Sequence, residues 1–594
     1  MQARFFSAVC SALVAVFALA ACQRQEPEGD AVQRGSSAAA AVNALADELL
    51  AHLKETSASV RMRSGVPVVA FDPVTLEQAQ KEAEFGTRML ERLNGIALDE
   101  LPSEERLLAG LLRHTFEMSA DAVESYWFEF AVTPYAGGMD LNEAHSILTN
   151  QPLGTAADRD SFLRLLDSYA VMLDQIAAKT RAQAERGLRV AKPAIPGVIE
   201  TFRGLRATAS ALAPSAERLE SVPSEEAASF DAQVQERLTK RVVPAYEAII
   251  GLFDDAYVRS APEQVGLGNY PGGKEHYLRL IRHYTGFDLD PQDIHEMGKR
   301  QVAELEERMQ AIREQLGFKG GREEFHDKLR KDRRFIAKSP EEVEQRYRAY
   351  VAKVEPHLPQ YFSRLPKARY DVARVAPAAE KGMTYGYYQP PTPADPVGYY
   401  FYNGSDLEKR SLVTAAHLIY HELVPGHHLH IALQTEREGA HPVRQFLLYG
   451  AFTEGWAEYG ASLGEKMGLY ADPYDLYGHL LLQAMLSVRL VVDTGMNALG
   501  MSLEEARNYM KAHTFESDVQ INSETLRYST DLYAQALSYR LGYEKFWELR
   551  RRAEESLGDA FDIREFHAAA IGEGAMPLNV LEEHIDRFIA ERAH

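Results

Sequence analysis

Apolar residues recur every three or four positions along most of the chain. The clearest stripe consists of Val302, Leu305, Met309, Ile312 and Leu316. This spacing places the side chains on one face of an α-helix, and Gly317, which follows, is typical of a helix end. Similar stripes occupy residues 160–188, 233–257, 340–363, 474–499, 524–555 and 577–592. The pattern therefore predicts a mainly α-helical protein.

One region departs from the helical pattern. Residues 365–404 are rich in proline, glycine and tyrosine. Within them, the run Gly398–Asn403 is aromatic and bounded by turn-forming residues, which favours a short β-strand. The sequence thus predicts a small β element directly before the helix that follows.

The first residues indicate export. Residues 1–21 carry a single charge, Arg4, followed by an apolar run that is short for a membrane-spanning helix, as in a secretory signal peptide. Residues 19–22, Leu-Ala-Ala-Cys, resemble a bacterial lipobox, which implies cleavage before Cys22 and lipidation of its thiol. Ordinary signal-peptidase cleavage after Ala-x-Ala is the alternative. Gln23 after the cysteine points to the outer rather than the inner membrane of the envelope.

The rest of the chain is predicted to be a tethered domain. Residues 22–41 are small and polar and predict a flexible tether. Residues 42–594 contain no internal repeat and no long low-complexity linker, so we expect a single helical domain. An arrangement of this domain in two lobes around a cleft is compatible with the sequence. No second segment comes close to an apolar run that spans a membrane.

Composition and charge exclude several classes of protein. Cys10 would leave with the signal peptide and Cys22 would be lipidated, so the folded domain has neither a free thiol nor a disulfide. Any metal must then be held by nitrogen and oxygen atoms. Hydrophobic residues make up 46% of the chain, as in a globular protein, and the formal net charge is −21. Such an acidic chain is not expected to bind nucleic acid or to carry a basic membrane-binding surface.

The stretch His421–His428 reads His-Glu-Leu-Val-Pro-Gly-His-His and opens like the zinc-peptidase signature H-E-x-x-H. In that signature both histidines bind the metal and the glutamate is a general base. Here Pro425 occupies the place of the second histidine. Proline removes a helical hydrogen bond and the following glycine permits unusual backbone angles, so we expect a two-residue bulge. His427 is then the better second ligand, with His428 as its competitor.

A third ligand is expected in the segment Phe452–Tyr459. It resembles the Glu-Gly-[Phe/Trp]-Ala-Glu segment that supplies the glutamate ligand in gluzincin peptidases, and Glu454 matches the ligand position. Glu458, four residues on, lies on the same helical face and could accept a hydrogen bond from a ligating imidazole. Gly455 would let a second backbone approach closely.

These segments, together with Arg527–Gly542, resemble the bacterial family called domain of unknown function 885. That family is placed near the all-helical gluzincins, similar to neurolysin and angiotensin-converting enzyme. The resemblance implies a large helical zinc-peptidase-like fold with a deep cleft and one Zn²⁺ per chain. In gluzincins an edge strand before the metal-site helix pairs with the substrate backbone. For Gly398–Asn403, a structural hairpin that packs its tyrosines is the alternative.

The other site residues follow from the ligands. Glu422 points away from the face of His421, so it is placed to take a proton from the attacking water and pass it to the leaving amine. The oxyanion needs a further donor besides the metal, and the resemblance implies Tyr528 or Tyr539 from a later helix. Arg527 either binds a substrate carboxylate or pairs with one of the many acidic residues.

The sequence therefore predicts a zinc peptidase of the bacterial cell envelope that hydrolyses peptide bonds. Short peptides are the expected substrates, because helical relatives enclose their active sites. The membrane is expected to be contacted through the N-terminal lipid only. Two alternatives remain: a peptide-binding lipoprotein with a structural or inactive metal site, and a metal-dependent amide or ester hydrolase acting on other substrates. Intact Glu422 favours catalysis, because a binding site has no need of that carboxylate.

Overall fold

The computed structural model describes residues 31–377, 379–380, 386–392 and 395–593. The predicted signal peptide and Cys22 lie outside the described residues. Helix α1 (Ala31–Thr56) begins inside the segment predicted to be a tether. Residues 38–41 are all alanine, which has the highest intrinsic helix propensity, and Val42 directly after them is buried. The predicted end of the tether at residue 41 is therefore wrong.

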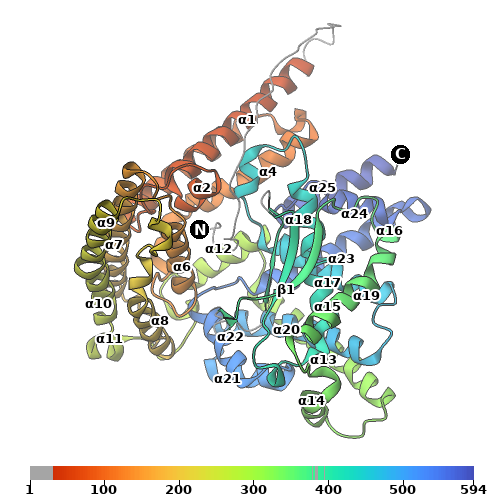
Figure 1. Ribbon diagram of the computed structural model, residues 1–594. Helices are drawn as coiled ribbons and strands as arrows, with labels where there is room; N and C mark the ends of the chain where they lie inside the picture. Colours follow the sequence, from red (N-terminus) through yellow and green to blue (C-terminus); the bar gives the residue numbers. More distant parts are fainter. Residues whose placement is uncertain (1–30, 378, 381–385, 393–394, 594) are drawn as a thin grey trace.

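Helices form most of the described chain, as predicted (Figure 1). The first half contains α2 (Ala58–Arg63), α3 (Leu76–Asn94), α4 (Ser103–Ala120), α5 (Ala122–Phe128), α6 (Ala136–Thr149), α7 (Ala156–Glu185), α8 (Ile195–Ala207), α9 (Ser224–Arg237), α10 (Val243–Gly251), α11 (Asp255–Ser260) and α12 (Gly273–Thr285). Figure 1 shows α7 to α11 grouped on one side of the molecule, where α10 packs on α7 and α8.

The second half carries the predicted site. Its helices are α13 (Pro291–Gln315), α14 (Arg322–Lys331), α15 (Pro340–Val354), α16 (Leu358–Tyr361), α17 (Ala415–Glu422), α18 (His427–Thr435), α19 (Gly450–Lys466), α20 (Pro473–Asn497), α21 (Leu503–His513), α22 (Asp518–Thr530), α23 (Leu537–Leu557), α24 (Ile563–Gly572) and α25 (Leu578–Arg592). α13 lies along α20, and α19 lies along α23. The two ends of the chain meet in one core, where α4 contacts α25.

Several apolar stripes match single helices, whereas those at 233–257 and 524–555 run across breaks between helices. The stripe at Val302–Leu316 forms the buried face of α13, and Gly317 takes a positive φ of 70° after the helix end. The stripe at 524–555 is divided between α22 and α23. Ala534 in the connection has a φ of 61°, a left-handed conformation that ends a helix. Periodicity continues across this break, which is why the sequence pattern missed it.

α20 is the central helix of the second half. Among the described residues it is the one helix long and apolar enough to cross a membrane, and 78% of its most apolar window is buried inside the protein. The expectation that no second segment is apolar enough to span a membrane is therefore wrong. A helix enclosed by neighbours must be apolar on all sides, as a membrane span is, so composition alone does not separate the two. α20 is accordingly a core helix in this structure.

A three-stranded sheet precedes α17. Its strands are β1 (Arg369–Arg374), β2 (Gly386–Gln389) and β3 (Val397–Tyr402). The strand predicted at Gly398–Asn403 is confirmed as β3. It lies in the middle of the sheet, parallel to β1 and antiparallel to β2, so the expected edge strand is wrong for this segment. Tyr400 and Tyr402 are buried against α15 and α17, as the hairpin alternative required.

Candidate metal centre

The motif His421–His428 spans a break between two helices. α17 ends at Glu422 and α18 begins at His427. Leu423 and Gly426 have ψ angles of −102° and −126°, far from helical values, and the peptide bond before Pro425 is cis. The predicted two-residue bulge is therefore too small: four residues leave the helix, because proline disfavours the helical conformation of the residue before it.

The break is packed tightly against neighbouring helices. A Cβ atom on Gly426 would lie 1.8 Å from the carbonyl oxygen of His421, so only glycine fits there. On the other side, the Trp456 indole donates a hydrogen bond of 3.0 Å to the carbonyl of Pro425. A Cβ atom on Gly460 would lie 2.8 Å from that same carbonyl oxygen. α19 thus fixes the turn that carries the second histidine back towards the first.

Three side chains from α17, α18 and α19 converge at this turn. Oε2 of Glu454 lies 3.6 Å from Nε2 of His421 and 3.4 Å from Nε2 of His427. Zinc binds nitrogen and carboxylate oxygen at about 2.0–2.2 Å, so a tetrahedral ion separates such ligand atoms by about 3.3–3.6 Å. Hydrogen bonds between these groups would be shorter, about 2.7–3.2 Å. The spacing therefore fits a metal ion better than direct hydrogen bonding.

The cluster is largely buried but not sealed. The side chains of His421 and His427 are 11% and 7% exposed, whereas that of Glu454 is 22% exposed. Glu422, at the last position of α17, is also half-buried. A metal held by the three groups would thus keep one side accessible, which is the arrangement of catalytic rather than structural zinc sites.

The adjacent His428 faces a different part of the molecule. Its Nδ1 lies 2.9 Å from the hydroxyl of Tyr388, and its Nε2 lies 3.2 Å from the carbonyl oxygen of Ala368. Burial lowers the pKa of His428 to about 4. Both ring nitrogens are engaged with the sheet, so the structure brings His427, and not His428, next to His421 and Glu454.

Glu458 supports His421 from behind. Its Oε1 lies 3.0 Å from Nδ1 of His421, which leaves Nε2 facing Glu454. Its Oε2 accepts a hydrogen bond of 2.8 Å from Gln483 and lies 3.3 Å from Nε2 of His417. The Arg540 guanidinium in turn donates to the Gln483 amide oxygen at 2.6 Å. The carboxylate is thereby fixed in position and can hold the imidazole of His421 in one orientation.

The contacts behind Glu458 reach the surface. Nδ1 of His417 lies 2.7 Å from Nδ1 of His479, and Nε2 of His479 lies 3.3 Å from Glu465. Arg308 pairs with Glu465 at 2.7 Å, and both are partly exposed. From the sequence alone, His417 could either support the site or simply pack in the core, and the structure places it beside Glu458. Its position one turn before His421 was the available signal, whereas His479 and Gln483 on α20 carried none.

Electrostatic effects within the cluster act in opposite directions. Burial alone would raise the pKa of Glu454, but the histidines beside it hold that pKa well below its usual value. Burial alone would lower the pKa of His421, but Glu458 and Glu454 raise it well above normal. The pKa of Glu422 is raised, chiefly by burial. A raised carboxylate pKa in a partly open site is typical of a general base.

The two tyrosines predicted to stabilise an oxyanion differ in their surroundings. Tyr528 is fully buried, and its hydroxyl accepts a hydrogen bond of 2.6 Å from Arg489. Tyr539 is half-buried. Its pKa is raised first by burial and next by the negative charge of Glu454. Tyr528 is thus engaged by an arginine, whereas Tyr539 is the tyrosine whose pKa responds to the charge of Glu454.

Close packing between α19 and α23 carries Tyr539 towards Glu454. A Cβ atom on Gly455 would lie 2.5 Å from the Cα atom of Gly542. The prediction that Gly455 permits close approach of a second backbone is confirmed. The two helices cross where the ligand segment and the tyrosine segment meet.

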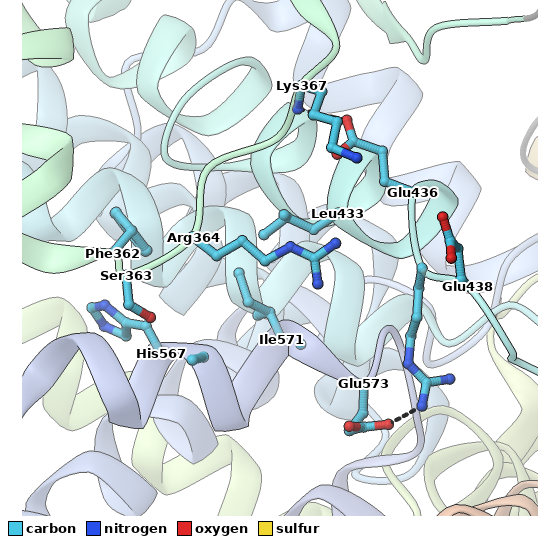
Figure 2. A pocket seen from close by; sticks show the side chains of 13 residues that line it. Phe362, Ser363, Arg364, Lys367, Leu433, Glu436, Glu438, His567, Ile571 and Glu573 are labelled. Atoms are coloured by element: carbon cyan, nitrogen blue, oxygen red, sulfur yellow. Dashed lines mark hydrogen bonds and ion pairs between the residues drawn. The ribbon is translucent and has the colours of Figure 1, made fainter.

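A cavity of about 490 Å³ lies elsewhere in this half of the molecule (Figure 2). It is lined by Phe362, Arg364, Leu433, His567, Ile571 and neighbours at the ends of α18 and α24. The predicted site residues are not among those that line it. The deep cleft at the metal centre stays a prediction.

Comparison with known proteins identifies the family. The model of the family "Bacterial protein of unknown function (DUF885)" matches residues 63–585. The chain belongs to this family. No curated protein matches the chain.

Two solved structures of candidate lipoproteins share the DUF885 fold. One, from Colwellia psychrerythraea, is 24% identical with a TM-score of 0.81, and the match covers 94% of this chain and 99% of that one. The other, of unknown function and from Shewanella oneidensis, is 17% identical with a TM-score of 0.69, covering 92% and 99%. These likenesses extend over the whole domain and establish the fold alone.

Proposed function

We propose that this DUF885 protein is a zinc-dependent peptidase. The observation that carries the proposal is the convergence of His421, His427 and Glu454, in which the Glu454 oxygen lies 3.6 Å and 3.4 Å from the two imidazole nitrogens. Glu422 follows His421 directly and is half-buried. Nitrogen and oxygen ligands of this kind suit zinc. We also propose that the helical fold is related to that of gluzincin peptidases, an idea that rests on the motif segments.

His421, His427 and Glu454 would hold the ion, and the ion would supply Lewis acidity at the scissile carbonyl. Glu422 accepts the proton of the attacking water as the carbon–oxygen bond forms. The same carboxyl group then gives that proton to the leaving amine as the carbon–nitrogen bond breaks. Its raised pKa suits both steps, since it holds the proton more readily than an ordinary glutamate does.

Tyr539 is the proposed donor to the oxyanion. The Tyr539 phenol is half-buried, and the negative charge of Glu454 contributes to its raised pKa. The Tyr528 hydroxyl, in contrast, is buried and accepts a hydrogen bond from Arg489. A neutral phenol with a raised pKa keeps its proton and can donate a hydrogen bond to developing negative charge. Glu458 contributes indirectly, because it holds the His421 ring in the orientation that binds metal.

The proposed location is the bacterial cell envelope. The lipobox at Cys22 and the description of the two structural relatives as candidate lipoproteins support a lipid-anchored protein, with the outer membrane favoured by Gln23. Peptides that reach this compartment are the proposed substrates.

Digestion of a diverse peptide library, followed by mass spectrometry, tests the proposal. Wild-type protein should carry close to one zinc per chain and cleave a subset of the library, and chelation should stop cleavage. Glu422→Gln should keep the zinc and lose at least about 10²-fold in rate, because it removes the general base but no ligand. A zinc-loaded wild type that cleaves no peptide would refute the proposal and favour a peptide-binding role.

A further inference from the structure

Two arginines, Arg489 and Arg527, share the carboxylate of Glu524. Oε2 of Glu524 lies 3.1 Å from Nη2 of Arg489 and 3.2 Å from Nη2 of Arg527. Glu524 is buried and carries one negative charge, so it balances only one of the two guanidinium groups. Glu516 also acts on Arg489, but more weakly than Glu524 does. Positive charge therefore remains available at Arg527.

Arg527 has an unused donor. Its Nε is buried and has no hydrogen-bond partner among the described residues, although the side chain as a whole is 26% exposed. A buried donor without a partner is unfavourable, so a ligand, an ion or a water that pairs with it would be stabilising. The planar fork of a guanidinium matches a carboxylate, which it can bind through two parallel hydrogen bonds.

Tyr539 connects these arginines to the metal centre. The Arg489 guanidinium carbon lies 4.9 Å from the centre of the Tyr539 ring. The Tyr539 phenol is within electrostatic range of Glu454 and of both arginines. A ligand that reaches Arg527 would therefore bind where charges still act on the phenol of Tyr539, the proposed oxyanion donor.

We propose that Arg527, supported by Arg489, binds the C-terminal carboxylate of a peptide, so that the enzyme removes residues from C-terminal ends. This inference rests on the proposed peptidase function and narrows its substrates. A free carboxylate pairs with the guanidinium, whereas a C-terminal amide or an internal segment leaves it unpaired. Sites built in this way discriminate strongly against analogues that lack the matching group.

Binding to zinc-loaded Glu422→Gln protein tests the inference without turnover. Two mixtures of N-acetylated tetrapeptides, identical except for a C-terminal acid or amide, are equilibrated with this protein. Bound peptides are then identified by ultrafiltration and mass spectrometry. Acids should bind about 10- to 100-fold more tightly than the matched amides, the range expected for hydrogen bonds to a charged group.

Further substitutions assign the effect to the guanidinium. Adding Arg527→Gln should remove the preference for acids and leave amide binding unchanged, whereas Arg527→Lys should keep part of it through its charge. Arg551→Gln, at an exposed arginine on α23, is the matched control and should keep the full preference. Thermal unfolding followed by circular dichroism verifies that each variant is folded.

Any of three results in the binding experiment would overturn the inference. These are equal binding of acids and amides, equal weakening of both by Arg527→Gln in a folded protein, and no binding of either mixture. The peptidase proposal is judged separately by cleavage with the wild type. Cleavage with no preference for free C-termini would refute the inference and leave the peptidase proposal standing.

Discussion

The structure contains two groups of histidine and glutamate side chains that share His421 but differ in character. In the first group, Oε2 of Glu454 lies 3.6 Å from Nε2 of His421 and 3.4 Å from Nε2 of His427, and Glu454 is partly exposed. In the second, the Glu458 oxygens lie 3.0 Å from His421 and 3.3 Å from His417. Both groups bring their potential ligand atoms within 4.8 Å of one another, so proximity alone does not separate them.

Hydrogen bonding and exposure do separate the two groups. Glu458 is buried, and one of its oxygens already accepts a hydrogen bond from Gln483. Glu454 faces two imidazole nitrogens at distances that suit a shared ion. These differences favour the first group as the proposed metal site and the second as a support that holds His421 in place.

The largest expected effect separates the two adjacent histidines. His427→Ala should lose stoichiometric zinc and all cleavage, because it removes one of three ligands. His428→Ala should keep the zinc, since both nitrogens of His428 are bound to Tyr388 and Ala368. Metal analysis of the purified variants measures this directly. Retention of zinc by His427→Ala together with its loss in His428→Ala would reverse the assignment.

A buried carboxylate away from the cluster tests why histidines hold the pKa values of Glu454 and Glu458 below normal. Asp493 lies on α20 with no histidine beside it, and burial raises its pKa to about 7, despite hydrogen bonds from Tyr277 and Asn497. Between the ordinary pKa of 3.8 and about 7, the folded protein binds this proton more tightly than the unfolded chain does. The free energy of unfolding should therefore fall as pH rises through that window.

Asp493→Asn removes this pH dependence. Between pH 5 and pH 7, wild type should lose up to about 1.4 kcal/mol per pH unit relative to Asp493→Asn, as measured by urea denaturation. Parallel pH profiles for the two proteins would show that burial does not raise this pKa, and would weaken the explanation given for Glu454 and Glu458.

The smallest expected effect concerns the supporting carboxylate. Glu458→Gln should keep one zinc per chain at saturating metal but lower the affinity about 10- to 100-fold, as is typical of partners that orient a ligand. Competition with a fluorescent chelator measures the affinity. Complete loss of zinc from a folded Glu458→Gln variant would indicate that the second group is itself the metal site.

Local sequence features predicted which side chains converge better than they predicted what surrounds those side chains. His421, Glu422 and the segment with Glu454 each lie in short motifs whose spacing follows from helix geometry. The choice between His427 and His428 could not be made from the sequence, because it depends on a turn in which four residues leave the helix. That turn is held by Trp456 and by the absence of a side chain at Gly426.

Features that depend on distant segments were predicted less well. From α20, Gln483 reaches Glu458 and His479 reaches His417, and nothing in the local sequence pattern of either residue indicates these contacts. The same holds for β3, whose pairing with β1 turns a predicted edge strand into a central one. Mainly helical content followed directly from periodicity, since most helices carry a continuous apolar stripe.

The position of the metal itself tests the account most directly. Crystals of the purified protein, measured on both sides of the zinc absorption edge, give an anomalous difference map that locates the ion. We predict a peak about 2.0–2.2 Å from Nε2 of His421, Nε2 of His427 and a carboxylate oxygen of Glu454. A peak between His417, His421 and Glu458, or no zinc peak at all, would contradict the account.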